Sequence, residues 1–239
     1  MVGAIYFILI QETTTSERSK IREESEKFIT TNPFDLAQIK GFSKYRSCEG
    51  HDYRYPSITG EMEATPRSMK HYVVVKEMFR GTVDQIDVFA PFNGKISNVE
   101  DEFIGGSQVW LAPNQGGTYD WQFVFFHLKL DEDKQKGVSV SAGEHIGTAN
   151  LRREHIGTTD NFDFALRLMR PLRQPAVDAP FNYATQELLA EYSTYGITID
   201  NLIISKEERD ARPCQISPNT EGTDIRFPTG IMADDYVWL

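Results

Sequence analysis

Residues 137–148 read GVSVSAGEHIGT, and this segment carries the clearest structural signal in the chain. Glycines stand at positions 137, 143 and 147, with the β-branched residues Val138, Val140 and Ile146 between them. Glycine readily adopts the positive φ of tight turns, whereas β-branched side chains favour strands. The pattern predicts a hairpin whose apolar side chains face one side.

The same kind of sequence, with strand-like runs between turn residues, extends from residue 71 to about residue 170. Short apolar or alternating runs are separated by clusters of Gly, Asn and Asp, as expected for strands joined by turns. The runs are residues 73–75, 86–89, 94–99, 108–112, 122–130, 138–140 and 162–169. Many short strands with turn signals predict a mainly β fold, an antiparallel β-sandwich or barrel.

The chain is expected to have four parts, two of them irregular extensions. Residues 28–70 form a loop-rich N-terminal extension, residues 71–170 the β domain, and residues 171–239 a C-terminal extension packed on it. The C-terminal part has too little apolar periodicity to fold alone. Its clear helix covers residues 185–195, with Leu188, Leu189, Tyr192 and Tyr195 on one face and Gly196 as the stop, so about one or two helices are expected.

The fourth part, residues 1–27, has two interpretations. Residues 1–10 (MVGAIYFILI) are apolar, but a bilayer span takes about 20 such residues. The segment is either the remnant of a signal or membrane anchor or an ordinary buried strand. The polar residues 13–27 that follow suit a stalk or a solvated helix, and they favour an anchor remnant with a stalk.

Composition excludes several classes of protein. Of 239 residues, 40% are hydrophobic and 25% charged, which excludes a fully disordered chain, a collagen and a multi-span membrane protein. Lys plus Arg number 25 and Asp plus Glu 35, a net charge of −10. Phosphate binding needs clustered basic residues, so nucleic acid is not an expected partner.

Three segments stand in order along the chain: FAPFNGKI at 89–96, VFFHL at 124–128 and GVSVSAGEHIGT at 137–148. Together they resemble one family, the lysostaphin-type or LytM-like zinc endopeptidases with a duplicated hybrid motif, which cut peptide cross-links of bacterial cell walls. The resemblance covers roughly residues 71–170 and implies an antiparallel β fold of the lysostaphin type.

The resemblance also implies site residues, and the set is incomplete. The family's early His-x-x-x-Asp corresponds to His71 and Val75, so an apolar side chain replaces one metal-binding carboxylate. His127 keeps the histidine of the His-Leu strand. In the late His-x-His pair, Asn161 replaces the catalytic histidine and Asp163 the ligand histidine. His71 and Asp163 alone are too few for a tight catalytic zinc site; a third ligand from Asp84, Asp87 or Asp160 has no support in the sequence.

The remaining histidines and the cysteines are interpreted more simply. His145 and His155 stand in turn-like contexts and are expected on the surface, although a shifted loop would bring His155 towards Asn161. His51 is either a metal-binding loop residue or part of a loop held by a disulfide. Cys48 and Cys214 are expected to pair if the chain is exported.

We therefore expect a degenerate, peptidase-like domain outside the cytoplasm that is not an enzyme and binds a cell-envelope peptide, glycan or partner protein. No cofactor is expected, zinc being the metal that the family would supply. The alternatives are an active zinc metalloendopeptidase with a rearranged site, using His71, Asp163 and His127, and a structural envelope-assembly protein whose groove is unused. The sequence does not determine the oligomeric state.

Overall fold

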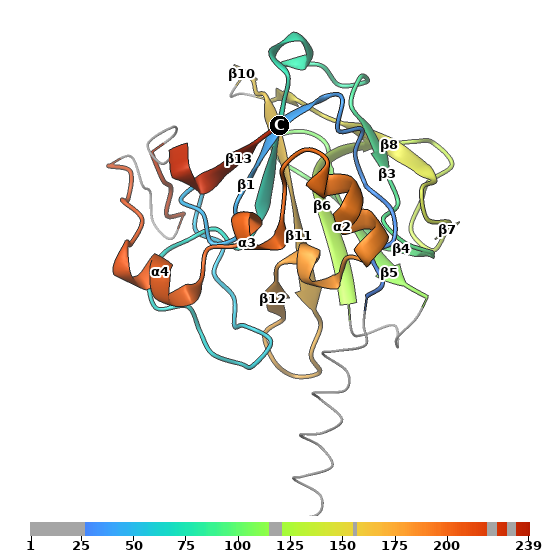
Figure 1. The fold of residues 1–239 in the computed structure, drawn as a ribbon. Helices are drawn as coiled ribbons and strands as arrows, with labels where there is room; N and C mark the ends of the chain where they lie inside the picture. Colours follow the sequence, from blue (N-terminus) through green and yellow to red (C-terminus); the bar gives the residue numbers. More distant parts are fainter. Residues whose placement is uncertain (1–26, 115–120, 155–156, 219–223, 229–232) are drawn as a thin grey trace, which may run out of the picture.

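The computed structural model describes residues 27–114, 121–154, 157–218, 224–228 and 233–239. Within these ranges the protein is mainly β, as predicted, and eleven strands form one antiparallel sheet (Figure 1). The main path of the sheet has the order β13-β1-β2-β11-β6-β5-β4-β7, with β12 beside β11 and β8 between β3 and β6. The predicted N-terminal anchor or stalk, up to residue 26, and His155 lie outside the described residues.

The predicted strand runs are confirmed as β2 (His71–Val75), β3 (Asp87–Phe89), β4 (Gly94–Asp101), β5 (Ser107–Pro113), β6 (Trp121–Leu130), β7 (Ser139–Val140) and β11 (Asn161–Leu168). The segment 137–148 supplies β7 and then β8 (His145–Ala149). The prediction that it forms a hairpin on its own is wrong, because β7 pairs with β4 while β8 pairs with β3 and β6. Gly147 has φ +153°, and a Cβ there would lie 2.3 Å from the Lys129 carbonyl oxygen. The close approach of β8 to β6 therefore requires glycine at this position.

Several short strands were not predicted from the sequence: β1 (Ile39–Ser43), β12 (Ala176–Asp178), β13 (Tyr236–Trp238) and the separate hairpin of β9 (Arg152–Arg153) with β10 (Gly157–Thr158). β1 pairs with β2 on one side and β13 on the other, so both extensions contribute strands to the central sheet. Three 3-10 helices complete the described elements: η1 (Glu77–Phe79), η2 (Pro180–Tyr183) and η3 (Ala233–Asp235).

The main core lies on one face of the sheet and is rich in phenylalanine. Phe123 stacks on Phe164 with ring centroids 5.4 Å apart, and Phe34 contacts Phe125 and Phe162 from the N-terminal extension. The aromatic residues Trp121, Phe123 and Phe125, which alternate along β6, are part of this core. The opposite face carries a second apolar cluster, made of Tyr45, Tyr53, Met69, Val124, Phe126, Ala165, Val177 and Ala179.

Helices from the C-terminal extension cover the main core (Figure 1). The predicted helix is confirmed as α2 (Gln186–Ser193), which Thr185 caps by accepting a hydrogen bond from the Leu188 N–H. Leu188 and Tyr192 are buried, whereas the predicted apolar position Tyr195 is 45% exposed. Two further short helices, α3 (Ile199–Leu202) and α4 (Lys206–Ala211), follow, one more helix than the sequence indicated.

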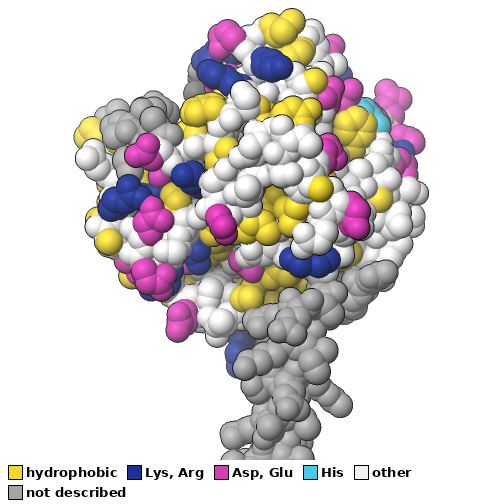
Figure 2. Space-filling view, viewed as in Figure 1, with side chains coloured by type: hydrophobic (Ala, Val, Ile, Leu, Met, Phe, Trp, Pro, Cys, Tyr) yellow, Lys and Arg dark blue, Asp and Glu magenta, His cyan; other side chains and the backbone are white. Residues whose placement is uncertain are grey.

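The expected pairing of Cys48 with Cys214 is confirmed as a disulfide spanning 166 positions. It ties the N-terminal extension to the chain after α4. On the face seen in Figure 2, Lys and Arg side chains lie interspersed with Asp and Glu. Within the described part of the chain, we find no helix that is long and apolar enough to span a membrane.

Candidate functional site

A cleft with a volume of about 570 Å³ opens on the face of the sheet opposite the main core. Strands β6 and β11, the segment before β2 and the C-terminal extension line it. Because side chains alternate along a strand, one face of β11 presents Asn161, Asp163 and Arg167 to the cleft, while Phe162 and Phe164 enter the core. The same alternation of polar and aromatic residues is visible in the sequence at residues 161–164 (NFDF).

A buried ion pair forms the floor of the cleft. The Lys70 Nζ atom lies 2.6 Å from Oδ2 of Asp163, and the two side chains are 4% and 2% exposed. Burial disfavours the charged carboxylate, but the Lys70 ammonium and the neighbouring His127 and His51 rings outweigh it, so the pKa of Asp163 lies below its usual value. Lys70 also lies 4.0 Å from the centre of the Phe126 ring. An ammonium group of the protein therefore occupies one of the two oxygens of this carboxylate.

His127 reaches the cleft through a β-bulge in β6. Val109 pairs with Phe125 and Ser107 with Leu128, so Phe126 and His127 together oppose one residue of β5. His127 has φ +61°, a left-handed conformation that is rare for residues other than glycine. The bulge interrupts the alternation, and both Phe126 and His127 line the cleft while Leu128 returns to the core. Strained backbone of this kind occurs preferentially at functional sites.

Gly106 makes room for this bulge. It has φ +79°, and a Cβ there would lie 2.9 Å from the His127 carbonyl carbon. A Gly-Gly pair is a turn signal in a sequence. In the structure, the turn at Gly105-Gly106 packs directly against the strained residue.

The titratable side chains of the cleft form a continuous series. His127 Nε2 lies 3.5 Å from Oδ1 of Asp163, and His127 Nδ1 lies 2.6 Å from Oε2 of Glu102. The same Glu102 oxygen accepts a hydrogen bond from the His127 backbone N–H at 2.7 Å. At the other end, Lys70 Nζ lies 3.2 Å from Nε2 of His51. The order is therefore His51, Lys70, Asp163, His127 and Glu102.

In this series, the His51 ring accepts a hydrogen bond from Lys70, because an ammonium group can only donate hydrogen bonds. Burial and the neighbouring ammonium lower the pKa of His51, which favours the neutral ring that such an acceptor requires. The loop of His51 is held by the adjacent Cys48 disulfide, as one of the two sequence interpretations had it. The same loop also delivers His51 to the cleft.

The structure does not bring His71 into this site, which corrects the expected His71–Asp163 ligand pair. In the register of β2 and β11, His71 pairs with Phe164 and Tyr72 with Asp163, so His71 faces the core. Its ring stacks on Phe164 at 5.2 Å, and its Nδ1 lies 2.7 Å from the Ser43 carbonyl oxygen. The ring is fully buried, and burial lowers the pKa of His71 to about 4.

The other expected site positions are divided between the cleft and its surroundings. Asn161 lines the cleft at the start of β11, whereas Val75 is buried in the core. Asp84, Asp87 and Asp160 do not line the cleft: Asp84 is exposed and Asp160 pairs with Arg80 at 3.3 Å. Asp87 and Asp131 flank the partly exposed His145 instead.

The donor set around Asp163 does not fit a catalytic zinc. A zinc ion needs about three protein ligands with free lone pairs. Here one oxygen of Asp163 accepts from Lys70, and His71 lies on the opposite face of its strand. In the ranges that the structure describes, no group of three His, Cys, Asp or Glu side chains is arranged to hold a metal ion.

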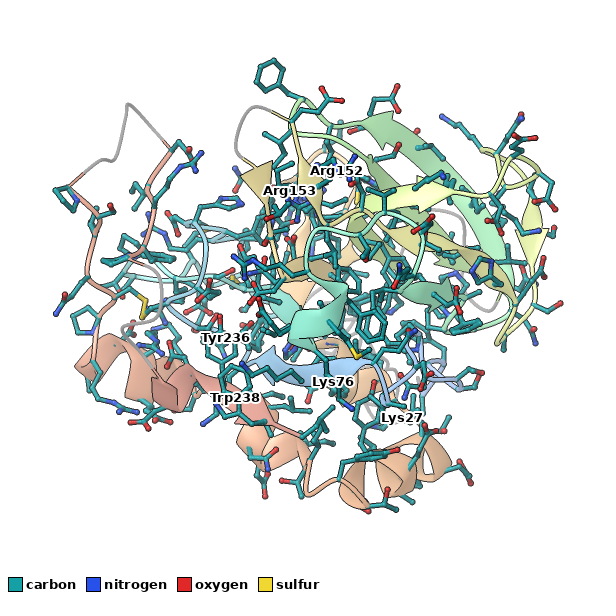
Figure 3. All side chains as sticks on the ribbon, turned by 90° about the horizontal axis from the view of Figure 1, so that it is seen from above. Lys27, Lys76, Arg152, Arg153, Tyr236 and Trp238 are labelled. Atoms are coloured by element: carbon teal, nitrogen blue, oxygen red, sulfur yellow. A yellow bond between two sulfur atoms is a disulfide. The ribbon has the colours of Figure 1, made fainter. Side chains whose placement is uncertain are left out.

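Two arginines in the cleft were not among the predicted site residues. Arg153 from β9 donates to the carbonyl oxygens of Asn150 and Asn161, each at 2.9 Å (Figure 3). Arg167 from β11 donates through Nε to the Tyr53 hydroxyl at 2.6 Å. Continuing the alternation of Asn161 and Asp163 by four residues would have indicated Arg167 from sequence. The sequence holds no comparable signal for Lys70, Glu102 and Arg153, because strand register and loop packing bring these residues into the cleft.

The C-terminal extension forms one wall of the cleft, with Asp224, Arg226 and Phe227 among the lining residues. Backbone hydrogen bonds hold this wall to the loop after Cys48: Asp52 N–H donates to the Ile225 carbonyl at 2.7 Å, and Phe227 N–H to the Gly50 carbonyl at 3.0 Å. The disulfide joins the same two segments nearby, so the covalent bond and the cleft wall belong to one unit.

Comparison with known proteins yields one structural similarity. No protein-family model matches the chain, and no curated protein matches its sequence. The NMR solution structure of lysostaphin is similar at 21% identity over 53% of this chain and 48% of that chain, with a TM-score of 0.32. The matched part therefore spans about half the length of lysostaphin.

Proposed function

We propose that this protein is a peptidase-like binding domain of the cell envelope that does not hydrolyse its ligand. The observation that carries the proposal is the buried pair of Lys70 Nζ and Asp163 Oδ2 at 2.6 Å. A hydrolytic zinc site needs a carboxylate free to bind the metal and an open position for water. Lys70 supplies the positive charge at this point instead, and it has no open coordination position to activate water.

The open cleft favours binding over a purely structural role. A groove filled by the chain's own side chains would favour an envelope-assembly protein, whereas this cleft keeps about 570 Å³ beside its polar floor. The resemblance of residues 89–96, 124–128 and 137–148 to cell-wall endopeptidases supports a peptide or glycan of the envelope, or an envelope protein, as the ligand.

The disulfide supports a location outside the cytoplasm. Such bonds form and persist in oxidising compartments and are rare where glutathione and thioredoxin keep thiols reduced. Cys48 and Cys214 are both buried, and their bond holds one wall of the cleft to the loop of His51. An exported protein with a disulfide-supported cleft is consistent with ligand binding at the envelope.

The test combines metal analysis, hydrolysis and binding on the full chain. We expect the purified protein to contain no stoichiometric zinc after incubation with zinc and dialysis. It should release no fragments from cross-linked cell-wall peptides, and it should co-sediment with purified cell-wall sacculi. An active lysostaphin-type endopeptidase serves as the positive control for hydrolysis. Stoichiometric zinc together with peptide release would overturn the proposal, and so would failure to co-sediment.

A further inference from the structure

The charge balance of the cleft differs from that of the whole chain. Acidic residues outnumber basic ones by 35 to 25 in the sequence. Among the residues that line the cleft the numbers are equal, with four basic side chains, Lys70, Arg153, Arg167 and Arg226, and four acidic ones, Glu49, Glu102, Asp163 and Asp224. The charged residues of the cleft thus balance to zero, whereas those of the whole chain sum to a net charge of −10.

Most of these charges are already matched inside the cleft. Lys70 pairs with Asp163, Arg226 with Asp224 at 2.7 Å, and Glu102 lies beside His127. Burial raises the pKa of the remaining carboxyl, Glu49, which favours its neutral form.

Two guanidinium groups remain without a carboxylate. Arg153 and Arg167 are only 9% and 8% exposed, and no carboxylate of the described residues lies within ion-pair distance of either. Their hydrogen bonds go to carbonyl oxygens and to a tyrosine hydroxyl, which are neutral acceptors. The carboxylates of Asp163 and Glu102 act on Arg153 only from beyond ion-pair distance. A buried cation without a close counter-ion is costly, and such groups are normally paired. A ligand carrying carboxylates would supply the missing partners.

The surroundings of Arg167 also favour a carboxylate ligand. Its guanidinium carbon lies 4.9 Å from the centre of the Trp110 ring and 5.3 Å from those of Tyr53 and Tyr55. The indole N–H of Trp110 is buried and has no hydrogen-bond partner among the residues described. At this end of the cleft the Arg167 guanidinium is therefore surrounded by aromatic rings and has a neutral hydroxyl, not a carboxylate, as its hydrogen-bond acceptor.

The two arginines stand at opposite ends of one strand. Arg153 bonds the carbonyl of Asn161 at the start of β11, and Arg167 lies six residues further along. At about 3.3 Å per residue, this separation is about 20 Å along the strand. An extended segment of about six residues covers that distance.

The aromatic rings of the cleft favour a peptide over a sugar polymer. A sugar platform needs exposed ring faces, but Tyr53, Tyr72 and Phe126 are only 7%, 6% and 3% exposed. Lys70 lies over the Tyr53 and Phe126 rings at 4.6 and 4.0 Å and takes part of the space a sugar would need. Guanidinium groups instead match carboxylates in a two-pronged geometry.

We propose that Arg153 and Arg167 are specificity-determining residues that bind two carboxylates of an extended acidic peptide lying along β11. This inference rests on the proposed binding function and adds the chemical class of the ligand. The two ends differ in character: Arg153 lies beside backbone carbonyls, whereas Arg167 is held between aromatic rings. Both guanidinium groups gain charge-assisted hydrogen bonds when the carboxylates bind.

The experiment uses the full, oxidised chain and a blocked hexapeptide with glutamate at both ends and four glycines between, measured by isothermal titration calorimetry. The reference peptide has glutamine in place of glutamate. We expect the glutamate peptide to bind at least about ten-fold more tightly, with weaker binding at high salt. Arg153→Gln and Arg167→Gln should each remove about ten-fold of this affinity.

Matched variants keep the test decisive. Arg152→Gln changes the exposed neighbour of Arg153 on β9 and should leave the affinity unchanged (Figure 3). Arg167→Lys keeps the charge among the aromatic rings but loses the two-pronged geometry, so it reports on recognition if Arg167→Gln fails to fold. Its affinity for the glutamate peptide should fall.

Three outcomes overturn the inference: equal affinity for the two peptides, no binding of the glutamate peptide, or binding of an oligogalacturonate of similar length in its place. Retention of cell-wall sacculi by the wild type and by Arg153→Gln/Arg167→Gln to the same extent would also overturn it. In that last case the proposed binding function would stand, because its own test does not depend on these arginines.

Discussion

Lys70, the residue directly before β2, and Asp163 of the neighbouring antiparallel strand β11 meet at 2.6 Å with both side chains at least 96% buried. This pair places a positive charge of the protein against the carboxylate that the sequence resemblance marks as a metal-ligand position. Because Lys70 also contacts His51, and Asp163 also contacts His127, the pair joins the two halves of the cleft.

Removing Lys70 should destabilise the protein strongly. Lys70→Met leaves the Asp163 carboxylate buried without its cation, and we expect a loss of about 3–5 kcal/mol of unfolding free energy at neutral pH. Lys70→Met/Asp163→Leu removes both charges and should recover most of that loss. Urea denaturation of the four members of this cycle gives the coupling energy.

An exposed pair provides the control for the Lys70 cycle. Lys206 and Asp210 lie 2.8 Å apart on α4 with about a third of each side chain exposed, so Lys206→Met should change stability by less than about 1 kcal/mol. If Lys70→Met proved no more destabilising than Lys206→Met, the buried pair would not hold the cleft floor together.

The core position of His71 predicts a sensitivity to mild acid. Its pKa is lowered to about 4 in the folded protein from 6.5, so between these values the unfolded chain binds more protons. Stability is therefore fully present above about pH 6.5 and falls as the pH drops towards 4, by about 3 kcal/mol in total. His71→Phe should flatten this part of the stability profile, measured by urea denaturation at a series of pH values.

His51 needs a separate variant in the same experiment, because its pKa is also lowered and the direction of its effect is the same. We expect His51→Gln to remove a smaller share of the slope than His71→Phe. His145→Gln changes a surface ring and serves as the control for mutation itself. A slope that persists undiminished in His71→Phe would show that another group titrates in this range.

The backbone at His127 predicts an unusual order of stability among its variants. His127→Gly and His127→Ala both remove the imidazole ring, but only glycine tolerates φ +61° without strain. We expect the glycine variant to be more stable than the alanine variant by about 1 kcal/mol. The order should reverse at Lys129, an exposed residue of the same strand, where glycine is the poorer strand residue. The same order at both positions would argue against strain at the bulge.

The disulfide should contribute substantially to stability and to the shape of the cleft. Closing a loop of this length stabilises by about 5 kcal/mol in the chain-entropy model. Cys48→Ser/Cys214→Ser should therefore lower the melting temperature, and reduced wild-type protein should match it. Ligand affinity should fall in parallel, since Asp224 and Phe227 form the wall next to the bond. Unchanged melting after verified reduction would contradict this prediction.

Local sequence determined much of the sheet. The apolar alternation that marks β4, β5, β6 and β11, the Thr185 cap and apolar spacing of α2, and the glycine turns depend on residues a few positions apart. For the same reason, the alternation of Phe162, Asp163 and Phe164 placed Asp163 on the polar side of its strand correctly.

Only the tertiary structure decided which partners Asp163 has. A shift of one residue in strand register exchanges the two faces of a strand, and the register between β2 and β11 depends on residues about 90 positions apart. It turns His71 into the core and Lys70 towards Asp163. The bulge at His127, the approach of Glu102 and the path of the C-terminal wall likewise arise from packing between distant segments, which is why the chemistry of the cleft does not follow from the motif alone.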